Sequence, residues 1–477
     1  MDHPMFRTKP VEELIAASQG EHSLKRVLKT YELVILGVGA VIGTGIFVLP
    51  GVAAITSGPA LPVSFVIAGL VCILAALCYA EFAAMVPVTG SAYTYCYASL
   101  GEIWAWIIGW DLVLEYSVAV SAVAIGWSGY VANLMSAAGL VLPPALINPP
   151  GTAGGIMNLP AFLIILVITG LLILGMKESA RVTAVVVAIK LAILVLFIVL
   201  CLGYFQPVNW ADFMPNGWTG VVAGAAVIFF AFVGFDSLVI AAEETENPEK
   251  SLPIALVATL LICMALYVAV AAMLTGIVPI SVIADQSAPI ANALNYIGIP
   301  WGAALVSVGA ICGMTTVLLM NLYGQSRIFF AMSRDKLLPS VLSEIHPGLK
   351  TPVKVTLMVG VVTAILAAFC PLRMVAELVN IGALFAFMVV ALGVLILRFK
   401  APLLSRPFRC PLVPVIPLLC ILFTGYLIAN LQTATHLQFI AWMALGIVVY
   451  FATCFRRHGR VAACPETVSP APVPIAG

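Results

Sequence analysis

The chain has 477 residues, of which 62% are hydrophobic and only 9% are Asp, Glu, Lys or Arg, and its net charge is +1. Soluble domains carry about 25% charged residues, so this composition excludes a soluble fold of the same size. The high hydrophobicity excludes a disordered chain, and the balanced charge excludes a basic surface for nucleic acid. An all-α polytopic membrane protein is therefore predicted.

The eleven cysteines are scattered through apolar segments without any CxxC pair. This spacing predicts neither a disulfide framework nor a metal site, and most of these cysteines are interpreted as small packing residues. No cofactor is expected.

Apolar segments long enough to cross a bilayer core, which takes about 20 helical residues, recur twelve times. They lie near 33–55, 60–85, 101–134, 158–176, 180–204, 218–242, 251–277, 300–332, 353–370, 374–397, 411–430 and 436–455. The third and eighth are longer than a bilayer requires, so we expect them to be tilted or to extend beyond it.

Lysine and arginine are distributed unevenly between these spans. Twenty of the 22 lie in the N-terminal tail, in the even-numbered loops or in the C-terminal tail. Because positively charged loops stay in the cytoplasm, both termini are predicted to be cytoplasmic, as an even number of spans also requires. The loop after the second span has no Lys or Arg, and its segment 87–93 is predicted to be re-entrant or interfacial.

The spans fall into two blocks of five followed by a pair. We expect a cytoplasmic tail over 1–32, a first repeat over 33–204, a second over 218–397, two further helices over 411–455, and a C-terminal tail over 456–477. The Pro, Ala and Val content of that last tail predicts disorder.

The first span of each block is weak as a helix. The first block opens with Gly37, Gly39, Gly43 and Gly45 within nine residues, and the second contains a comparable weak segment over 229–236. Glycine in a helix costs about 1 kcal/mol relative to alanine. Interrupted helices at matching places in two halves indicate a midplane site in an inverted-repeat transporter, although glycines also serve close helix packing.

An interrupted helix exposes N–H and C=O groups that hydrocarbon cannot satisfy, so these groups become useful only when a ligand binds them. The N–H groups after the first break, at about Thr44 and Gly45, suit a carboxylate, and carbonyls that end the preceding half-helices suit an ammonium. Together they predict a receptor for the α-amino and α-carboxyl groups of an amino acid. The predicted substrate-binding residues at the breaks are Val41, Gly43, Thr44, Gly45, Phe230, Ala231 and Val233.

Four motifs extend this pattern: Gly37–Phe47, Glu243–Pro253, Gly324–Arg327 and Met332–Pro339. They resemble the amino acid–polyamine–organocation superfamily, and most closely the bacterial members of its cationic amino acid transporter branch. The resemblance covers about residues 25–455. It implies the leucine-transporter fold, a 5+5 inverted repeat with broken helices 1 and 6 plus two C-terminal helices. It also implies a secondary transporter of L-amino acids in the inner membrane of a bacterium.

Lys190 lies near the middle of the fifth span, about ten residues from either end. Such a lysine costs about 2.5–3.5 kcal/mol on translocon scales. Burial favours its neutral form, so it is a candidate to exchange a proton near neutral pH, with snorkelling to the surface as the alternative. The resemblance implies that sodium-driven relatives bind sodium between spans 1 and 8, and that a span 5 lysine takes this place in proton-coupled relatives. Lys190 matches that position.

Asp111 and Glu115 are four residues apart on the third span and share one helix face. We expect them to face the interior, either as proton-relay groups or as neutral hydrogen-bonding partners, and Glu115 is the preferred proton-coupling residue. Asp236, at the second break, is interpreted as a helix cap or a substrate ligand. Glu81 and Glu377 lie near span ends, and their sequence context indicates no role.

Asn321 is a polar residue in the apolar run of the eighth span. It is interpreted either as a specificity residue of the substrate pocket or as an interhelical hydrogen-bonding residue. The acidic loop 243–249 is interpreted either as part of an inner gate paired with Arg327 or Arg334, or as a solvated loop, since exposed ion pairs contribute only about 0–1 kcal/mol.

The predicted function is import of an L-amino acid by proton symport, or exchange of amino acids, through alternating access. The expected partners are the amino acid, protons and the lipid bilayer, without nucleic acid. A small membrane-helix partner, the oligomeric state, and a cationic or small neutral substrate side chain stay open. An amine or polyamine antiporter is the alternative. A channel is a further possibility. A nutrient sensor, or an intramembrane hydrolase using Ser128 of a GxSG motif, is disfavoured, the hydrolase because every histidine lies outside the spans or at their edges.

Overall fold

The computed structural model describes residues 8, 28–86, 91–152, 154–175, 180–334, 337–349 and 351–452. This described chain is helical, with one isolated parallel bridge between Leu28 and Thr245. The predicted C-terminal tail, most of the predicted N-terminal tail and Pro87–Gly90 lie outside the described residues.

The helices lie where apolar spans were predicted. In chain order they are α2 (Thr30–Val41), α3 (Thr44–Phe47), α4 (Leu49–Ser57), α5 (Leu61–Met85), α7 (Glu102–Ala137), α9 (Leu159–Ile173), α10 (Ala180–Cys201), α11 (Gly217–Ile228), the 3₁₀ segments η5 (Phe229–Phe232) and η6 (Phe235–Glu244), α12 (Pro248–Ile277), α15 (Pro300–Arg334), α16 (Val353–Phe369), α17 (Leu372–Lys400), α18 (Val415–Ala429) and α19 (Thr433–Tyr450). In the described chain, seven helical segments are long and apolar enough to cross a membrane, and five shorter apolar helices accompany them.

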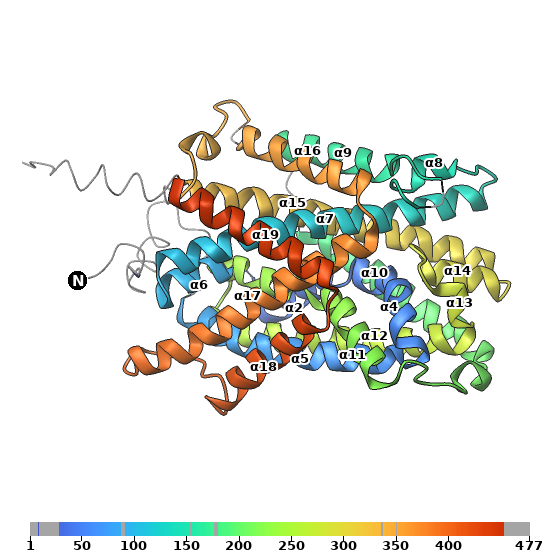
Figure 1. The fold of residues 1–477 in the computed structure, drawn as a ribbon, viewed down its shortest axis with the longest axis horizontal. Coiled ribbons are helices and arrows are strands. Elements are labelled where there is room, and N and C mark those ends of the chain that lie inside the picture. The colour runs from blue at the N-terminus through green and yellow to red at the C-terminus, as the bar shows by residue number, and fades with distance from the viewer. Residues whose placement is uncertain are drawn as a thin grey trace, which may run out of the picture.

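Short helices mark the two ends of the molecule. Most of the long helices run roughly along its long axis, with α6 (Ser91–Ser99) at one end and α8 (Pro144–Ile147), α13 (Ile280–Ile283) and α14 (Pro289–Tyr296) at the other (Figure 1). Because α6 follows an even-numbered span and the other three follow odd-numbered ones, successive connections alternate between the ends. This alternation is what helices that cross a layer in turn require.

The long helices α7 and α15 pack against each other in the interior, and α17 packs on α7. At 1.5 Å per residue, the 36 residues of α7 extend over roughly 54 Å, more than the hydrocarbon core of a bilayer. Peripheral helices instead expose apolar side chains, such as Val199 on α10 and Leu437 on α19. Exposed apolar side chains on the outer helices are the pattern of a protein that lipid surrounds.

Glu81, at one end of α5, is buried and fully hydrogen-bonded. Its carboxylate accepts hydrogen bonds from Arg398 (2.8 and 2.9 Å), from Arg406 Nε (3.2 Å) and from the backbone N–H of Cys410 (2.8 Å). Arg406 also donates to backbone carbonyls at the end of α17 and in the loop that follows. This charged cluster joins α5 to the end of α17, so Glu81 has a structural environment that its sequence context did not indicate.

A second buried carboxylate, Glu377, ties α17 to α19 at the opposite end of α17. It accepts hydrogen bonds from Arg373 Nε (3.2 Å) and from Thr435 Oγ1 (2.7 Å). Further along α19, the indoles of Trp110 and Trp442 stack at 4.7 Å, and each Nε1 donates to the other residue's carbonyl. The last helix is thus fixed to both α17 and α7.

Candidate functional site

The first break interrupts the glycine-rich segment. Helix α2 ends at Val41, Ile42 is extended (φ −75°, ψ 95°), and α3 begins at Thr44. The helix bends again at Val48, where α4 takes over. Since the first N–H groups of a helix have no partner within that helix, the N–H groups of Thr44 and Gly45 are available at this break.

Donors from three neighbouring helices reach backbone carbonyls of this region. Lys190 Nζ on α10 donates to the Gly39 carbonyl (2.9 Å), and the hydroxyl of Tyr267 on α12 donates to the Val41 carbonyl (2.9 Å). After the break, the Tyr130 hydroxyl on α7 donates to the Phe47 carbonyl (2.6 Å). The protein itself therefore satisfies carbonyls that the break would otherwise leave exposed.

The second break lies between η5 and η6. Gly234 has φ 115°, a conformation that a residue with a side chain rarely adopts. The Gly234 N–H donates to Asp236 Oδ1 (3.1 Å), so Asp236 binds back across the break. At the start of η5, the Phe230 N–H donates to Asn380 Oδ1 on α17 (2.6 Å). Here side chains accept from N–H groups, which none of the three donors at the first break does, and Asn380 Nδ2 also donates to the Val227 carbonyl (2.7 Å).

The two breaks touch each other. A Cβ on Gly45 would lie 2.3 Å from Ala231 Cα, and a Cβ on Gly234 would lie 3.0 Å from the Ala40 carbonyl oxygen. Side chains at these two positions would separate the broken segments. The glycines are therefore required for the close approach of backbones that are almost 200 residues apart in the sequence.

A cavity lies at the crossing of the two broken segments, where they contact each other. It is lined by Ala40, Val41, Gly43, Thr44, Gly45, Glu115, Tyr116, Ala119, Val123, Phe230, Val233, Gly234, Asp236, Val317 and Asn321. Its volume of about 30 Å³ is room for water molecules and not for a large ligand. Thr44 Oγ1, which is buried, has no hydrogen-bond partner among the described residues.

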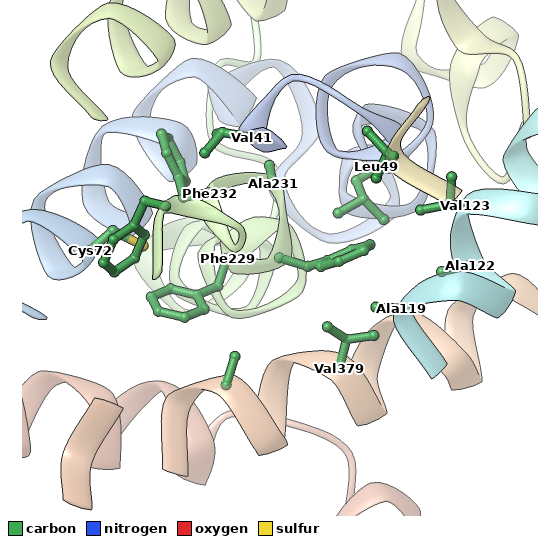
Figure 2. Close-up of a cluster of buried hydrophobic side chains, with 14 of the residues drawn as sticks. Val41, Leu49, Cys72, Ala119, Ala122, Val123, Phe229, Ala231, Phe232 and Val379 are labelled. Atoms are coloured by element: carbon green, nitrogen blue, oxygen red, sulfur yellow. The ribbon is translucent and has the colours of Figure 1, made fainter. Parts of the chain in front are cut away.

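Eight of the ten predicted site residues line this cavity, and Ala231 and Lys190 do not. Ala231 packs its backbone against Gly45, directly behind the crossing. Figure 2 shows Ala231 on the turn that also carries Phe229 and Phe232, with Val41 across from it. Asn321 lies on the cavity wall, half-buried, and makes no interhelical hydrogen bond within the described chain.

Lys190 is 1% exposed and lies between α2 and α15. Its ammonium nitrogen contacts the Gly39 carbonyl, and a Cβ on Gly313 of α15 would lie 2.8 Å from Lys190 Cε. The side chain is therefore directed into the protein, and the snorkelling alternative was wrong.

Asp111 and Glu115 face the interior together, as their spacing predicted. Gly382 of α17 packs on both, since a Cβ there would lie 3.1 Å from Asp111 Oδ1 and 3.4 Å from Glu115 Cβ. Both oxygens of Asp111 and Oε2 of Glu115 are buried and have no hydrogen-bond partner within the described residues.

Arg327 and the described side chains of the acidic loop, Glu246 and Glu249, do not line the cavity. Arg327 stacks on Tyr323 at 4.9 Å and makes no ion pair with Glu246 or Glu249 among the described residues, while the side chains of Arg334, Glu243 and Glu244 lie outside them. The described residues contain no group of three His, Cys, Asp or Glu side chains placed to hold a metal ion.

Sequence reasoning missed three residues at the breaks: Tyr130, Tyr267 and Asn380. Asn380 offered a signal, because it is a polar residue within the apolar run of α17, the criterion that singled out Asn321. The tyrosines offered none, since a tyrosine in an apolar helix is as readily a packing residue.

Known proteins resemble this chain over nearly its whole length. Residues 28–452 match the sequence model of a family described as amino acid permease. The branched-chain amino acid permease BcaP of Bacillus subtilis strain 168 is 50% identical over 464 residues, which cover 97% of this chain and all of the relative.

Two further relatives have different named substrates. The methylthioribose transporter of Bacillus subtilis is 47% identical over 449 residues, covering 94% of this chain and 97% of the relative. The vacuolar cationic amino acid transporter 4 of Arabidopsis thaliana is 40% identical over 410 residues, covering 83% and 68%. These relatives are named permeases and transporters and not enzymes. With its apolar helices and the motifs of the amino acid–polyamine–organocation superfamily, the chain belongs to the amino acid permeases, multi-pass membrane proteins that transport amino acids.

Proposed function

We propose that this protein imports a neutral aliphatic L-amino acid together with a proton. In this proposal, helices from 33–204 and 218–397 form the inverted repeats of a leucine-transporter-type fold of twelve membrane-spanning helices, and 411–455 supplies the two additional helices. The end that carries α6 faces the cytoplasm, because most Lys and Arg residues belong to connections at that end.

The hydrogen bonds at the two breaks support a zwitterionic substrate. At the first break, protein donors satisfy carbonyls, and the N–H groups of Thr44 and Gly45 stay available for a carboxylate. At the second, Asn380 and Asp236 accept from N–H groups, Asn380 also donates to the Val227 carbonyl, and the remaining carbonyls of that segment would receive an ammonium. This juxtaposition is the observation that carries the proposal.

The rest of the cavity wall supports an aliphatic side chain. Ala119, Val123 and Val317 face the breaks, with the ring of Phe230 beside them. The two acidic residues on this wall are Glu115 and Asp236, and Asp236 already accepts from the Gly234 N–H. The branched-chain amino acid named for one relative fits this wall.

Lys190 is proposed to carry the coupling proton. Protonated, its ammonium holds the Gly39 carbonyl just before the break; neutral, it holds that carbonyl less strongly. A proton gradient of about 150 mV supplies roughly 3.5 kcal/mol, enough for accumulation of a few hundredfold. Glu115, on the cavity wall, is proposed to assist.

The cavity must open and enlarge for a substrate to enter. The segments that form the breaks, with α5 and α12, are proposed to rock against the remaining helices, exposing the crossing to each side in turn. Substrate binding then depends on which side is open.

Uptake into proteoliposomes tests this function. The purified protein is supplied with leucine, valine, alanine, lysine, arginine and the corresponding amines, with proton and sodium gradients imposed separately. We expect saturable uptake of the branched-chain amino acids that an inward proton gradient stimulates and a sodium gradient does not. Sodium dependence, or preference for the decarboxylated amines, would contradict the proposal and favour the antiporter.

Methylthioribose is a second candidate substrate, because a relative that carries this name is 47% identical. It has no carboxylate for the N–H groups at Thr44 and Gly45. Competition by methylthioribose against leucine, stronger than competition by valine, would replace the amino acid proposal with this one.

A further inference from the structure

Asn380 is a fully buried amide on α17 that lies against the turn of the second break. Figure 2 shows Val379, its neighbour, pointing from α17 toward this turn, which carries Phe229, Ala231 and Phe232. In the described chain, α17 otherwise contacts this region through apolar side chains such as Phe387, which packs on Phe229. A buried polar group here therefore requires a specific explanation.

Every hydrogen-bonding group of the Asn380 amide is in use. Its Oδ1 accepts from the Phe230 N–H (2.6 Å), and its Nδ2 donates to the Val227 carbonyl (2.7 Å) and to the Ala376 carbonyl on its own helix (2.9 Å). An asparagine amide offers two N–H donors and one carbonyl, the same groups as a peptide unit plus one donor.

The two partners in the second break are three residues apart and lie on either side of the place where α11 becomes the 3₁₀ segment η5. Val227 is in the last turn of α11, and Phe230 is in η5. The amide therefore stands between a helical carbonyl and an N–H of the next turn, as an inserted peptide group would. Because both bonds come from α17, this helix fixes the geometry at which α11 ends.

Phe230 connects this backbone constraint to the cavity. Its N–H is the group that Asn380 holds, and its residue lines the cavity opposite Ala119 and Val123 of α7. A rotation of the Phe230 backbone would move its ring with respect to the substrate side chain. The Asn380 side chain does not line the cavity itself.

We propose that Asn380 is a positioning residue for substrate selection, which acts on the substrate side chain through Phe230. This inference rests on the proposed function and adds the residue that sets the size of the side-chain pocket. It assigns the choice between large and small aliphatic amino acids to a helix that does not touch the substrate.

The test compares Asn380→Leu, which has a similar size but no amide, with the unaltered protein. In counterflow with equal pH on both sides, leucine, valine and alanine compete against labelled leucine. We expect the ratio of leucine to alanine inhibition constants to shift about tenfold, because two buried backbone groups lose partners worth about 1 kcal/mol or more. The maximal exchange rate should change less than the ratio.

A double-mutant cycle tests whether Asn380 acts on the substrate side chain through Phe230. In Phe230→Ala, which lacks the ring, Asn380→Leu should shift the same ratio less than twofold, since interacting residues are non-additive. Thr424→Val is the matched control: Thr424 is also fully buried and donates to carbonyls, but on α18, away from the cavity. It should leave the ratio unchanged.

An unchanged ratio in folded Asn380→Leu, or an equal shift in the Phe230→Ala background, would overturn the inference. If Asn380→Leu does not give monodisperse protein, Asn380→Ser takes its place, and the ratio is again expected to shift, with the same decisive outcomes. Failure of the unaltered protein to exchange leucine would instead contradict the proposed function, so the two failures are distinguishable.

Discussion

The two breaks are interruptions of the same kind, and the protein stabilises them with different hydrogen bonds. At the first, Lys190 and Tyr267 donate to carbonyls of α2. At the second, Asn380 and Asp236 accept from N–H groups, and Asn380 also donates to the Val227 carbonyl. A break has both donors and acceptors to satisfy, and in the proposed function the groups that the protein leaves unsatisfied are the ones that bind the substrate.

The glycines differ as well. Gly45 in the first segment is needed for the close approach of another backbone, whereas Gly234 in the second is needed also for its left-handed conformation. The comparison teaches that similar interruptions in two segments need not be stabilised by the same kinds of residue.

The largest effect is expected where the breaks touch. In Gly45→Ala the new Cβ would lie 2.3 Å from Ala231 Cα, which is backbone and cannot rotate away. The two segments must separate, so leucine uptake should fall by roughly a thousandfold, equivalent to about 4 kcal/mol. Gly425→Ala on α18, where a Cβ meets nothing within 4 Å, should transport normally. Normal uptake in Gly45→Ala would show that the contact is not required.

Among the three side-chain donors at the first break, Lys190 is the charged one. Lys190→Ala should abolish proton-driven accumulation, a loss of a few hundredfold in the steady-state gradient, while exchange without a gradient continues. Lys354→Ala is the control, because Lys354 is 60% exposed and pairs with Glu344 outside the cavity. Full pH stimulation in Lys190→Ala would contradict the coupling role, and the measurement is uptake at a series of external pH values.

The neutral donor at the first break should matter less. Tyr267→Phe removes one hydroxyl and leaves the buried Val41 carbonyl without its 2.9 Å partner. An unsatisfied buried group costs about 1–3 kcal/mol, so the KM for leucine should rise about tenfold. Tyr426→Phe, on the exposed face of α18, is the matched control. A KM equal to that of the unaltered protein would mean that water replaces the hydroxyl.

The smallest effect is expected at the second break. Asp236→Asn keeps an oxygen that can accept from the Gly234 N–H, so leucine KM should change less than about threefold. Asp236→Leu lacks any acceptor and should raise KM about tenfold. If Asp236→Asn were as severe as Asp236→Leu, the charge of Asp236 and not its hydrogen bond would be the essential property.

Much of the fold could be predicted from hydropathy, because a bilayer imposes one length and one polarity on every crossing segment. The four glycines within nine residues indicated the position of the first break, because each glycine weakens a helix. The partners of each break could not be predicted, because Tyr267 and Asn380 lie 226 and 150 residues from the groups that they bind. Which helices contact each other depends on tertiary packing. The hydrophobic periodicity of a single sequence predicts helices and does not predict these contacts.

Glu81 has a consequence for how the molecule can move. Its carboxylate joins the end of α5 to Arg398 on α17 and to the loop at Arg406 and Cys410 with four hydrogen bonds. Parting these ions would leave charges buried without partners, which typically costs about 3–5 kcal/mol. In the proposed alternating-access cycle, we therefore expect this cluster to stay intact, so that α5 keeps its contact with α17 at this end while the broken segments move.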